Sequence, residues 1–524
     1  MSDTYDHEPS LPWELDPEEA TGLPEEPMAE LTKEQQAFLD AVADAEPGAL
    51  IALTGEGGAG KTYVLARMAS AHLARMAVKE EEEAVPRLGR DQAPLVVFAC
   101  PTHQARNVLK DELEAAGCDA QVTTVASLLK KAPDRSRPPT GDVLRQTFIS
   151  NGGDPLPPGT ILVLDEVSMD SVADVAALRA LNKAGVTVLS GDPAQLPPVE
   201  GESIWQALAK TEAAGKATHY HLTQNLRARS PDLVSYINEI RRTGALPAHA
   251  PAEVVTIYRN RRQFHEALLV CLNEGGPSRV AALAYRNDTV NRTADVVRAA
   301  YGYRPGYAVD GEVLRVNGAM SVLDWRTEYE RLKYEEGMSQ EDAFRQASEN
   351  VRDRQIQTGD LMVVLKAGEP KPYSVAWAPG QAMQQVCLVR MLTGAFEGEE
   401  RRLPLARLGN PQDVKDLLEA CRLTIKQAVD GVANQYTSEI DRDFRTGHLP
   451  PAGKLWGEYF YKVQDKFCLA QNAASMTIHK AQGSGRDHVF VDWVDLAGDE
   501  ADQLRYTACS RARQHLHILV GGAP

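Results

Sequence analysis

Short, mostly apolar runs alternate with longer helix-like stretches along the chain. Three of these runs, residues 49–53, 161–164 and 186–189, are followed at once by polar residues or glycine. Apolar runs of this length, with helical stretches between them, are typical of buried strands in a parallel sheet. Because ligands bind at the carboxyl ends of such strands, the polar residues after each run are candidates for a functional site.

The first run leads into a glycine-rich loop, Gly55–Thr62, with the pattern G-x-x-x-x-G-K-T, and then into a helix-like stretch. Glycines let backbone N–H groups point at phosphate oxygens, and the start of the helix offers its positive end. The pattern predicts binding of ATP, with Lys61 at the β- and γ-phosphates and Thr62 on Mg²⁺. The predicted nucleotide-binding residues of the loop are Gly55, Gly57, Gly58, Ala59, Gly60, Lys61, Thr62 and Tyr63.

Two acids, Asp165 and Glu166, follow the second run. Asp165 suits the carboxylate on the Mg²⁺ side of a P-loop nucleotide hydrolase, and Glu166 is then placed to orient the attacking water. An acid after a strand can also be a helix N-cap or an ordinary loop residue. The presence of Lys61 upstream favours the catalytic interpretation.

The third run ends in Gly191, Asp192 and Gln195, and two prolines then prevent its continuation. As a strand of the same parallel sheet, it would deliver Gln195 to the edge where the γ-phosphate or the catalytic water lies. We therefore predict that Gln195 senses the γ-phosphate. Pro197 and Pro198 would fix the loop that leaves the site.

Composition describes an ordinary globular protein, with 43% apolar and 25% charged residues over 524 positions, long enough for three or four domains. No apolar run is long enough to span a bilayer and no signal peptide opens the chain, so we expect no membrane association. The seven cysteines are scattered, without a C-x-x-C pair. This spacing argues against metal sites and disulfides and favours a reducing cytoplasm.

The net charge of −17 argues against nucleic-acid binding by bulk electrostatics. Residues 1–30 hold ten acids and no Lys or Arg, and removing these ten negative charges from −17 leaves −7. We interpret this segment as a disordered acidic tail. The tail, and a second acidic run at 80–83, can serve solubility, or can repel or mimic nucleic acid or bind a partner.

The full motif series resembles a superfamily 1 helicase, and more narrowly its RecD/Dda branch. The resemblance covers about residues 31–520 and rests on nine motifs in order: Leu31–Gln36 (the Q motif), Gly55–Thr62, Ala99–Ala105 (Ia), Thr123–Leu129 (Ib), Leu164–Met169 (II), Gly191–Pro198 (III), Leu222–Arg227 (IV), Ser475–Ser484 (V) and Tyr506–Arg513 (VI). Departures are mild: Cys509 replaces a packing residue in motif VI, and Gln224 stands in motif IV where an acid is usual.

The resemblance implies further site residues. Gln35 would read the adenine, Gly483 would approach the phosphates, and Arg227 and Arg511 would stabilise the charge that hydrolysis builds on the γ-phosphoryl group. A lone arginine is more often part of a surface ion pair, and the family match overturns that interpretation, most firmly for Arg511. Contacts to single-stranded DNA are expected from Pro101, Thr102, His103, Thr124, Ser127, Thr477 and His479.

The implied fold class is α/β, with two RecA-like P-loop domains whose parallel sheets are flanked by helices. We expect the first at 31–190, with a small pin insertion at about 130–159, and the second in two parts at 191–307 and 471–524, interrupted by an SH3-like β-barrel plus helical insertion at 308–470. Phe148 is the aromatic residue of the pin segment and our candidate for meeting the duplex junction. Alternatively, Phe148 anchors the small core of the insertion itself.

The sequence thus predicts an ATP-dependent DNA helicase that translocates 5′ to 3′ on single-stranded DNA, with a direction that comes from the resemblance alone. The alternatives are a superfamily 1 RNA helicase and a DNA-stimulated ATPase subunit that remodels recombination complexes without unwinding. Expected partners are single-stranded DNA, junctions of single- and double-stranded DNA, and single-strand-binding, replication, recombination or repair proteins. We expect a monomeric motor in the cytoplasm, either the bacterial cytosol and nucleoid or a phage-infected cell.

Overall fold

The computed structural model describes most of the chain. The described residues are 31–82, 96–118, 120–133, 148–150, 152–198, 202–213, 215–223, 230–321, 325–340, 342–343, 346–347, 355–409, 411–435, 459 and 463–521. The chain forms two compact units, each described by itself below. The larger unit comprises residues 10–132, 150–290 and 474–524, and the smaller unit comprises residues 1–9, 133–149 and 291–473.

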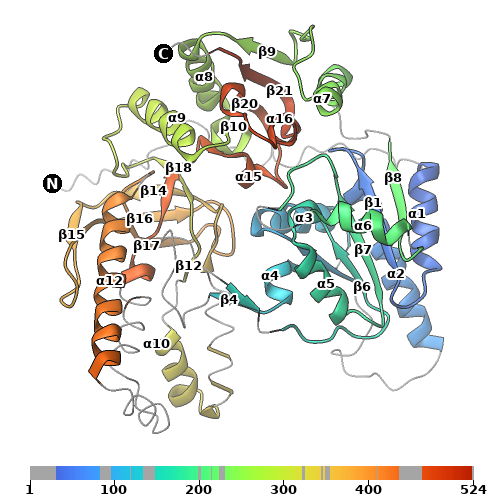
Figure 1. Ribbon diagram of the computed structural model, residues 1–524, viewed down its shortest axis with the longest axis horizontal. Coiled ribbons are helices and arrows are strands. Elements are labelled where there is room, and N and C mark those ends of the chain that lie inside the picture. Colours follow the sequence, from blue (N-terminus) through green and yellow to red (C-terminus); the bar gives the residue numbers. More distant parts are fainter. Residues whose placement is uncertain are drawn as a thin grey trace, which may run out of the picture. The chain divides into compact units, whose positions relative to one another are not determined.

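The first sheet of the larger unit is wholly parallel within the described ranges, in the order β3-β2-β6-β7-β1-β8 (Figure 1). Its strands are β1 (Leu50–Gly55), β2 (Val96–Cys100), β3 (Gln121–Thr124), β6 (Ile161–Leu164), β7 (Val186–Gly191) and β8 (Thr218–Leu222). The helices around it are α1 (Lys33–Ala43), α2 (Lys61–Glu82), α3 (His103–Ala115), α4 (Val125–Leu128), α5 (Val172–Leu181) and α6 (Ile204–Ala213), with a 3₁₀ turn at Val167–Met169.

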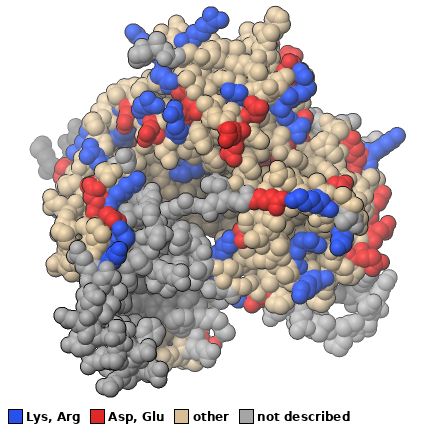
Figure 2. All heavy atoms as spheres, viewed as in Figure 1, with Lys and Arg blue, Asp and Glu red and all other residues tan. Residues whose placement is uncertain are grey.

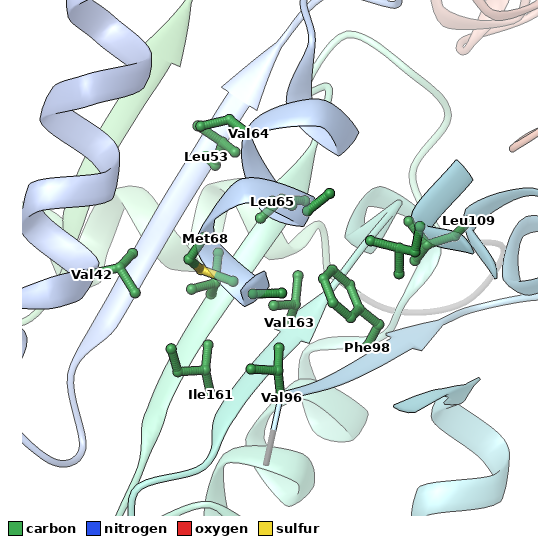
Figure 3. Close-up of a cluster of buried hydrophobic side chains, with 14 of the residues drawn as sticks. Val42, Leu53, Val64, Leu65, Met68, Val96, Phe98, Leu109, Ile161 and Val163 are labelled. Atoms are coloured by element: carbon green, nitrogen blue, oxygen red, sulfur yellow. The ribbon is translucent and has the colours of Figure 1, made fainter. Parts of the chain in front are cut away.

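Both faces of this sheet are buried, because successive residues of each strand point to opposite sides. On one face, strand residues such as Phe98 and Val163 pack with Leu65 and Met68 of α2 and Leu109 of α3 (Figure 3). On the other face, the alternate strand residues pack with α4, α5 and α6. Burial on both sides explains why these strands are continuous apolar runs in the sequence.

The second sheet of the larger unit is also parallel, in the order β19-β10-β20-β21-β9 over the part of the chain that is described. Its strands are β9 (Val255–Tyr258), β10 (Val280–Ala284), β19 (Ser475–Thr477), β20 (Arg486–Asp492) and β21 (Ala512–Leu519). Its helices are α7 (Pro231–Thr243), α8 (Arg261–Arg279), α9 (Asn287–Ala300), which continues into the smaller unit, α15 (Ile478–Ala481) and α16 (Ala501–Cys509), with a 3₁₀ turn at Trp493–Asp495.

The smaller unit is built on an antiparallel sheet in the order β15-β16-β14-β11-β18, with β17 paired to β16. The sheet closes on itself, because Ala406 N after β17 donates to Cys468 O before β18 at 3.0 Å, and Cys468 N donates to Pro404 O at 2.8 Å. Its strands are β11 (Val313–Val316), β14 (Leu361–Lys366), β15 (Lys371–Tyr373), β16 (Ala382–Met391), β17 (Glu400–Leu405) and β18 (Ala470–Asn472). This closed sheet is the small barrel that the sequence analysis predicted.

Helices and short strands complete the smaller unit. Leu417, Leu418 and Cys421 of α12 pack with Val463 and Phe467 in a second apolar cluster. The remaining elements are α10 (Trp325–Glu330), a π-helical turn (Arg331–Glu335), α12 (Gln412–Gln435), a 3₁₀ turn (Gln464–Lys466) and the paired strands β12 (Met320–Ser321) and β13 (Gln355–Ile356).

The structure differs from the expected boundary at residue 190. Strand β8 pairs in parallel with β1, from Ile51 beside Thr218 to Gly55 beside Leu222, so the first sheet continues to Leu222. Residues 191–222, expected in the second domain, therefore belong to the first sheet. Strand β8 is mostly polar and partly exposed at the sheet edge, so it lacks the apolar run that marks the other strands.

The expected pin insertion lies between two short paired strands, β4 (Lys131–Pro133) and β5 (Phe148–Ser150). Phe148 begins β5, and its side chain and the tip of the pin, residues 134–147, lie outside the described residues. The acidic tail at 1–30 and the acidic run at 80–83 also lie outside the described side chains. Among the described residues, no helix is long and apolar enough to cross a membrane.

Candidate functional site

The glycine-rich loop connects β1 to α2 in the conformation that phosphate binding requires. Gly58 and Gly60 have φ of 90° and 77°, a region that favours glycine. Helix α2 begins at Lys61, so its first N–H groups open towards the loop. The Lys61 Nζ donates to the carbonyl oxygens of Gly55 at 2.8 Å and Glu56 at 3.1 Å, which folds the ammonium back over the loop.

Asp165 and Glu166 lie directly after β6, one strand away from β7 and two from β1. Burial, and to a smaller extent the adjacent Glu166, raise the pKa of the Asp165 carboxyl to about 6, although the Ser190 hydrogen bond and Lys61 act in the opposite direction. The Ser190 hydroxyl donates to Asp165 at 2.7 Å. Glu166 has φ of 52°, which is strained for a side chain larger than glycine and typical of functional sites.

These groups fit a magnesium site. The hydroxyl of Thr62 and the carboxylate of Asp165 are hard oxygen ligands of the kind that Mg²⁺ takes alongside phosphate oxygens. The electrostatic effect of Lys61 on Asp165 indicates that the two ends of the site face one region. A bound Mg²⁺ would offset the cost of keeping Asp165 ionised in this enclosed position.

The loop after β7 joins the two sheets of the larger unit. The Leu196 N–H donates to the Thr507 hydroxyl of α16 at 3.2 Å, and the Tyr506 hydroxyl donates to Asp192 at 2.5 Å. Asp192 is fully buried, so this charged hydrogen bond is shielded from water. Gln195 is 4% exposed, and its buried Oε1 has no hydrogen-bond partner among the described residues. A buried carboxamide oxygen without a partner suits a position that a ligand or water completes.

Arg241 of α7 is a residue of this network that the sequence analysis missed. Its guanidinium donates to Asp192 at 2.9 Å and to Glu56 of the glycine-rich loop at 3.3 Å. One arginine of the second sheet's helices therefore contacts both the phosphate loop and the loop of Gln195. Arg241 lies in no motif of the series, so the only sequence signal was an arginine in the last turn of an amphipathic helix, which is usually exposed.

Arg511 lies between α16 and β21 and is 7% exposed. Its guanidinium donates to Thr507 O at 3.2 Å and to the Ser510 hydroxyl at 2.8 Å, which holds the side chain against the end of α16. Gly483 has φ of 75°, and a Cβ atom there would lie 2.7 Å from the Ala105 Cβ of α3. The predicted residue Arg227 lies outside the described residues.

Gln35 and Tyr63 have intramolecular partners. Gln35 forms a capping box with Thr32, whose backbone N–H donates to Gln35 Oε1 at 3.0 Å. The Tyr63 hydroxyl accepts hydrogen bonds from Arg67 at 3.0 and 3.2 Å. The structure places both residues on helices that flank β1.

The expected DNA contacts share one construction. Thr102, Thr124 and Thr477 each lie at or just after the end of a parallel strand and cap the next helix, accepting from the N–H of the residue three positions on. Ser127 adds a hydroxyl contact of 2.9 Å to Thr124. Each cap presents a hydroxyl group beside a helix start, and both features suit contacts to a nucleic-acid backbone.

The two histidines of these motifs are neutral and partly enclosed. Burial lowers the pKa of His103 to about 4, with Arg106 adding to the effect, and the buried Nδ1 of His103 has no hydrogen-bond partner among the residues that the structure describes. Burial also lowers the pKa of His479, whose ring lies 6.0 Å from the Tyr285 ring. Pro101 leads from β2 into the same turn as His103. Neutral rings of this kind can stack on bases without drawing on net charge.

Charge is mixed over the surface in view. Figure 2 shows Lys and Arg interspersed with Asp and Glu on the described residues of this face rather than gathered in one basic field. This distribution agrees with the net charge of −17 and favours local contacts from hydroxyls, amides and rings over bulk attraction.

Solved structures of Pif1 helicases are similar over most of the chain. A structure titled for DNA unwinding at forked double-stranded DNA by two coordinating Pif1 helicases is 15% identical, with 94% of this chain and 93% of that chain covered and a TM-score of 0.42. The Pif1 helicase from Candida albicans is 14% identical (94% and 96% covered, TM-score 0.41). The Pif1 helicase from Bacteroides with ADP-AlF3 and single-stranded DNA is 14% identical (94% and 92%, TM-score 0.40). Likeness at this level carries no argument about function.

Family comparisons are more specific. The AAA domain family matches residues 30–268, and the UvrD-like helicase C-terminal domain family matches residues 472–519. No curated protein matches the chain. The two matches together cover the first sheet and all strands of the second sheet except β10, and they contain the P-loop, the acidic pair and motifs V and VI. Their order along one chain, with the motif series that runs through both, supports an ATP-dependent DNA helicase of the superfamily 1 type.

Proposed function

We propose that the protein translocates 5′ to 3′ along single-stranded DNA and unwinds duplex DNA ahead of it, driven by ATP hydrolysis. The observation that carries the proposal is the network in which the phosphate loop, the loop of Gln195 and two helices of the second sheet are joined through Asp192 and Arg241. Such a network can transmit the state of the nucleotide to both sheets.

The proposed hydrolytic site uses groups at the carboxyl ends of β1, β6 and β7. Lys61 and the loop N–H groups hold the phosphates, Glu166 orients the attacking water, and Gln195 contacts the γ-phosphate or that water. Thr62 and Asp165 hold Mg²⁺, which neutralises charge on the phosphate oxygens when it is bound. Arg511, and Arg227 beyond the described residues, stabilise the charge that develops in the transition state.

Loss of the γ-phosphate would leave Gln195 without its contact. The loop containing Leu196 would then shift against Thr507 and Tyr506, since both hydrogen bonds belong to the same short segment. The proposed DNA contacts, from Thr102, Thr124 and their neighbours on one sheet and Thr477 on the other, follow strands of both sheets. Alternating grip by the two sets converts opening and closing into movement along the strand.

Junction recognition is proposed for the pin between β4 and β5, with Phe148 stacking on a base at the fork. The proposed partners are single-stranded DNA, forked junctions and single-strand-binding or replication, recombination and repair proteins. The proposed setting is the cytosol and nucleoid of a bacterium, or a phage-infected cell, with a monomer as the motor.

The test is unwinding of duplexes that carry either a 5′ or a 3′ single-stranded tail, with Lys61→Ala as the inactive control. Unwinding that needs ATP and the 5′ tail supports the proposal. Unwinding from the 3′ tail alone would contradict the direction.

Two further outcomes would replace the proposal. ATPase activity stimulated by single-stranded RNA but not DNA would identify an RNA helicase. DNA-stimulated ATPase activity without strand separation from either tail would identify a remodelling subunit. A duplex with both tails, tested beside the single-tailed ones, distinguishes a junction requirement from a direction requirement.

A further inference from the structure

One cluster of potential metal ligands lies outside the helicase site, on the second parallel sheet. His488 in β20, His517 in β21 and Cys271 in α8 bring their ligand atoms within 4.8 Å of one another. Among the described residues, no other group of three potential metal ligands lies this close together. The three residues are far apart in the sequence, so no spacing pattern announces them.

Strand alternation places this cluster. Val489, Val491, Leu516 and Ile518 face the core formed with α7 and α16. Successive strand residues point to opposite faces, so His488, Phe490 and His517 face the other side, beneath α8. Phe264 of α8 contacts the Phe490 ring there, with ring centroids 5.3 Å apart. Cys271 lies two turns further along α8 and is therefore next to the two histidines.

The distances fit a tetrahedral ion. Metal–nitrogen bonds near 2.0–2.1 Å and metal–sulfur bonds near 2.3 Å imply separations of about 3.4 Å between two nitrogens and about 3.5 Å between nitrogen and sulfur. His488 Nδ1 and His517 Nε2 are 3.3 Å apart, Cys271 Sγ lies 3.8 Å from His488 Nδ1, and the third pair of ligand atoms lies within 4.8 Å. Two of the three separations are close to those of a bound ion, and binding requires the Cys271 sulfur to adjust towards His517.

The chemical state of the ligands is also suitable. Burial lowers the pKa of His517 to about 3 and lowers that of His488, so both rings are neutral and present lone pairs. The Tyr258 hydroxyl lies 3.1 Å from His517 Nδ1, where it can accept that proton and direct the Nε2 lone pair into the cluster. Burial raises the pKa of the Cys271 thiol, so metal binding must release a proton.

We propose that Cys271, His488 and His517 form a structural site for a zinc-class divalent ion, with water as the fourth ligand. A thiolate with two imidazoles is a donor set that zinc and cobalt accept well. The ion would tie α8 to β20 and β21, on the face of the sheet opposite α7 and α16. Its role is to stabilise the second sheet, and it takes no part in hydrolysis.

The test uses the full chain, purified without a histidine tag, with Co²⁺ as the probe in the absence of nucleotide and in excess Mg²⁺. We expect one Co²⁺ per chain with a sulfur-to-cobalt absorption band, zinc in the protein as isolated, and a melting temperature that rises with added Zn²⁺. Cys271→Ser should abolish the band. His488→Gln should weaken Co²⁺ binding by more than the roughly 10–100-fold typical for loss of a supporting hydrogen bond.

Matched controls are Cys118→Ser and His249→Gln, which remove the same chemical groups elsewhere in the larger unit. Both should bind Co²⁺ as the unchanged protein does. Cys271 lies outside the proposed hydrolytic machinery, so unchanged ATPase activity of Cys271→Ser confirms that this variant folds. Absence of the cobalt band in the unchanged protein, or its persistence in Cys271→Ser, would overturn the proposal and leave a hydrogen-bonded histidine cluster.

Discussion

At the scale of single residues, some polar groups of the site have hydrogen-bond partners within the protein and others do not. Lys61 and Arg511 both have intramolecular partners, whereas the Gln195 oxygen is buried without one. Asp165 is kept in a position where ionisation is costly. The protein holds these residues in conformations that are more favourable with a ligand bound than without one. Such a loss of stability in the free protein is common at functional sites.

Gln195→Ala should slow hydrolysis on the order of 10²-fold, comparable to removal of one preorganised donor from a charged transition state. Nucleotide binding should be largely retained, because Lys61 and the loop N–H groups are unchanged. Steady-state ATPase rates and the affinity for a fluorescent ATP analogue measure the two effects. Gln206→Ala, an exposed glutamine on α6, is the control. Equal loss of binding and hydrolysis would argue against a sensing role.

Asp165→Asn should stabilise the free protein while abolishing hydrolysis. The folded protein raises the Asp165 pKa from 3.8 to about 6, so it binds the proton more tightly than the unfolded chain and loses stability as pH rises through this window. The variant should gain on the order of 1–2 kcal/mol at pH 8, after allowance for solvent access, and the gain should disappear as pH falls towards 4.

Thermal unfolding of both proteins at pH 4.5, 6 and 8, without Mg²⁺ or nucleotide, measures this difference. Ser190→Ala tests the neighbouring hydroxyl, because its loss should raise the Asp165 pKa further and lower stability at pH 8. A variant Asp165→Asn that is less stable than the unchanged protein at pH 8 would contradict the prediction.

At the scale of elements, the loop after β7 and helices α7 and α16 act as one unit. The side-chain part of this connection centres on one buried carboxylate, Asp192, with Tyr506 on one side and Arg241 on the other, and the Leu196 N–H adds a hydrogen bond to Thr507. The Arg241 guanidinium also lies 5.5 Å from the centre of the Tyr506 ring. A buried carboxylate that accepts hydrogen bonds from side chains on two helices is destabilised by the loss of either partner.

Tyr506→Phe should lower the free energy of unfolding by about 1.5–3 kcal/mol, the range for hydrogen bonds to charged groups. DNA-stimulated ATPase activity should fall more than basal activity, because Asp192 belongs to the connection between sheets and does not touch the nucleotide. Denaturant unfolding and ATPase assays with and without single-stranded DNA measure both. Tyr334→Phe, a 72% exposed tyrosine, is the control. Parallel loss of both activities would assign Tyr506 a purely structural role.

Phe148→Ala should reduce unwinding while leaving ssDNA-stimulated ATPase activity unchanged, since base stacking on an aromatic side chain contributes about 1–3 kcal/mol. Phe148→Trp should retain unwinding, because it keeps the stacking surface. Strand-separation assays on a forked duplex measure the effect. Normal unwinding by Phe148→Ala would show that Phe148 instead anchors the core of its own insertion.

At the scale of the whole molecule, an acidic chain must hold a polyanion. The uneven charge along the sequence offers an explanation, since residues 1–30 carry ten of the negative charges and the rest of the chain is close to neutral for its length. The proposed DNA contacts are hydroxyls, helix starts and neutral rings, which do not depend on net charge.

Deletion of residues 1–30 should tighten binding to single-stranded DNA at low salt, because the net charge rises from −17 to −7. The difference should shrink as ionic strength approaches 1 M, where the screening length is about 3 Å. Fluorescence anisotropy with a labelled oligonucleotide at two salt concentrations measures this. A tail variant of equal length with Ser and Gly in place of the acids separates charge from length. Equal affinity at low salt would favour a role in solubility.

Local pattern alone determined much of this protein. Apolar runs bounded by glycine or acids located β1, β6 and β7, because strands buried on both faces need continuous apolar side chains. The polar residues after these runs identified Lys61, Asp165, Glu166 and Gln195 as candidates, since parallel strands deliver their carboxyl ends to one edge. Strand β8 was not predicted, because an edge strand is only partly buried and needs no apolar run.

The tertiary structure determined which residues that are distant in the sequence come into contact. Arg241 reaches Glu56 and Asp192 only because α7 packs beside α16 and the loop after β7, and nothing in its local sequence marks this. Cys271, His488 and His517 meet because β20 and β21 are neighbours and α8 crosses above them. The spacing of apolar residues in the sequence indicates which residues are buried and whether they lie on a strand or a helix. Contacts between residues hundreds of positions apart depend instead on how the strands are ordered in the sheet.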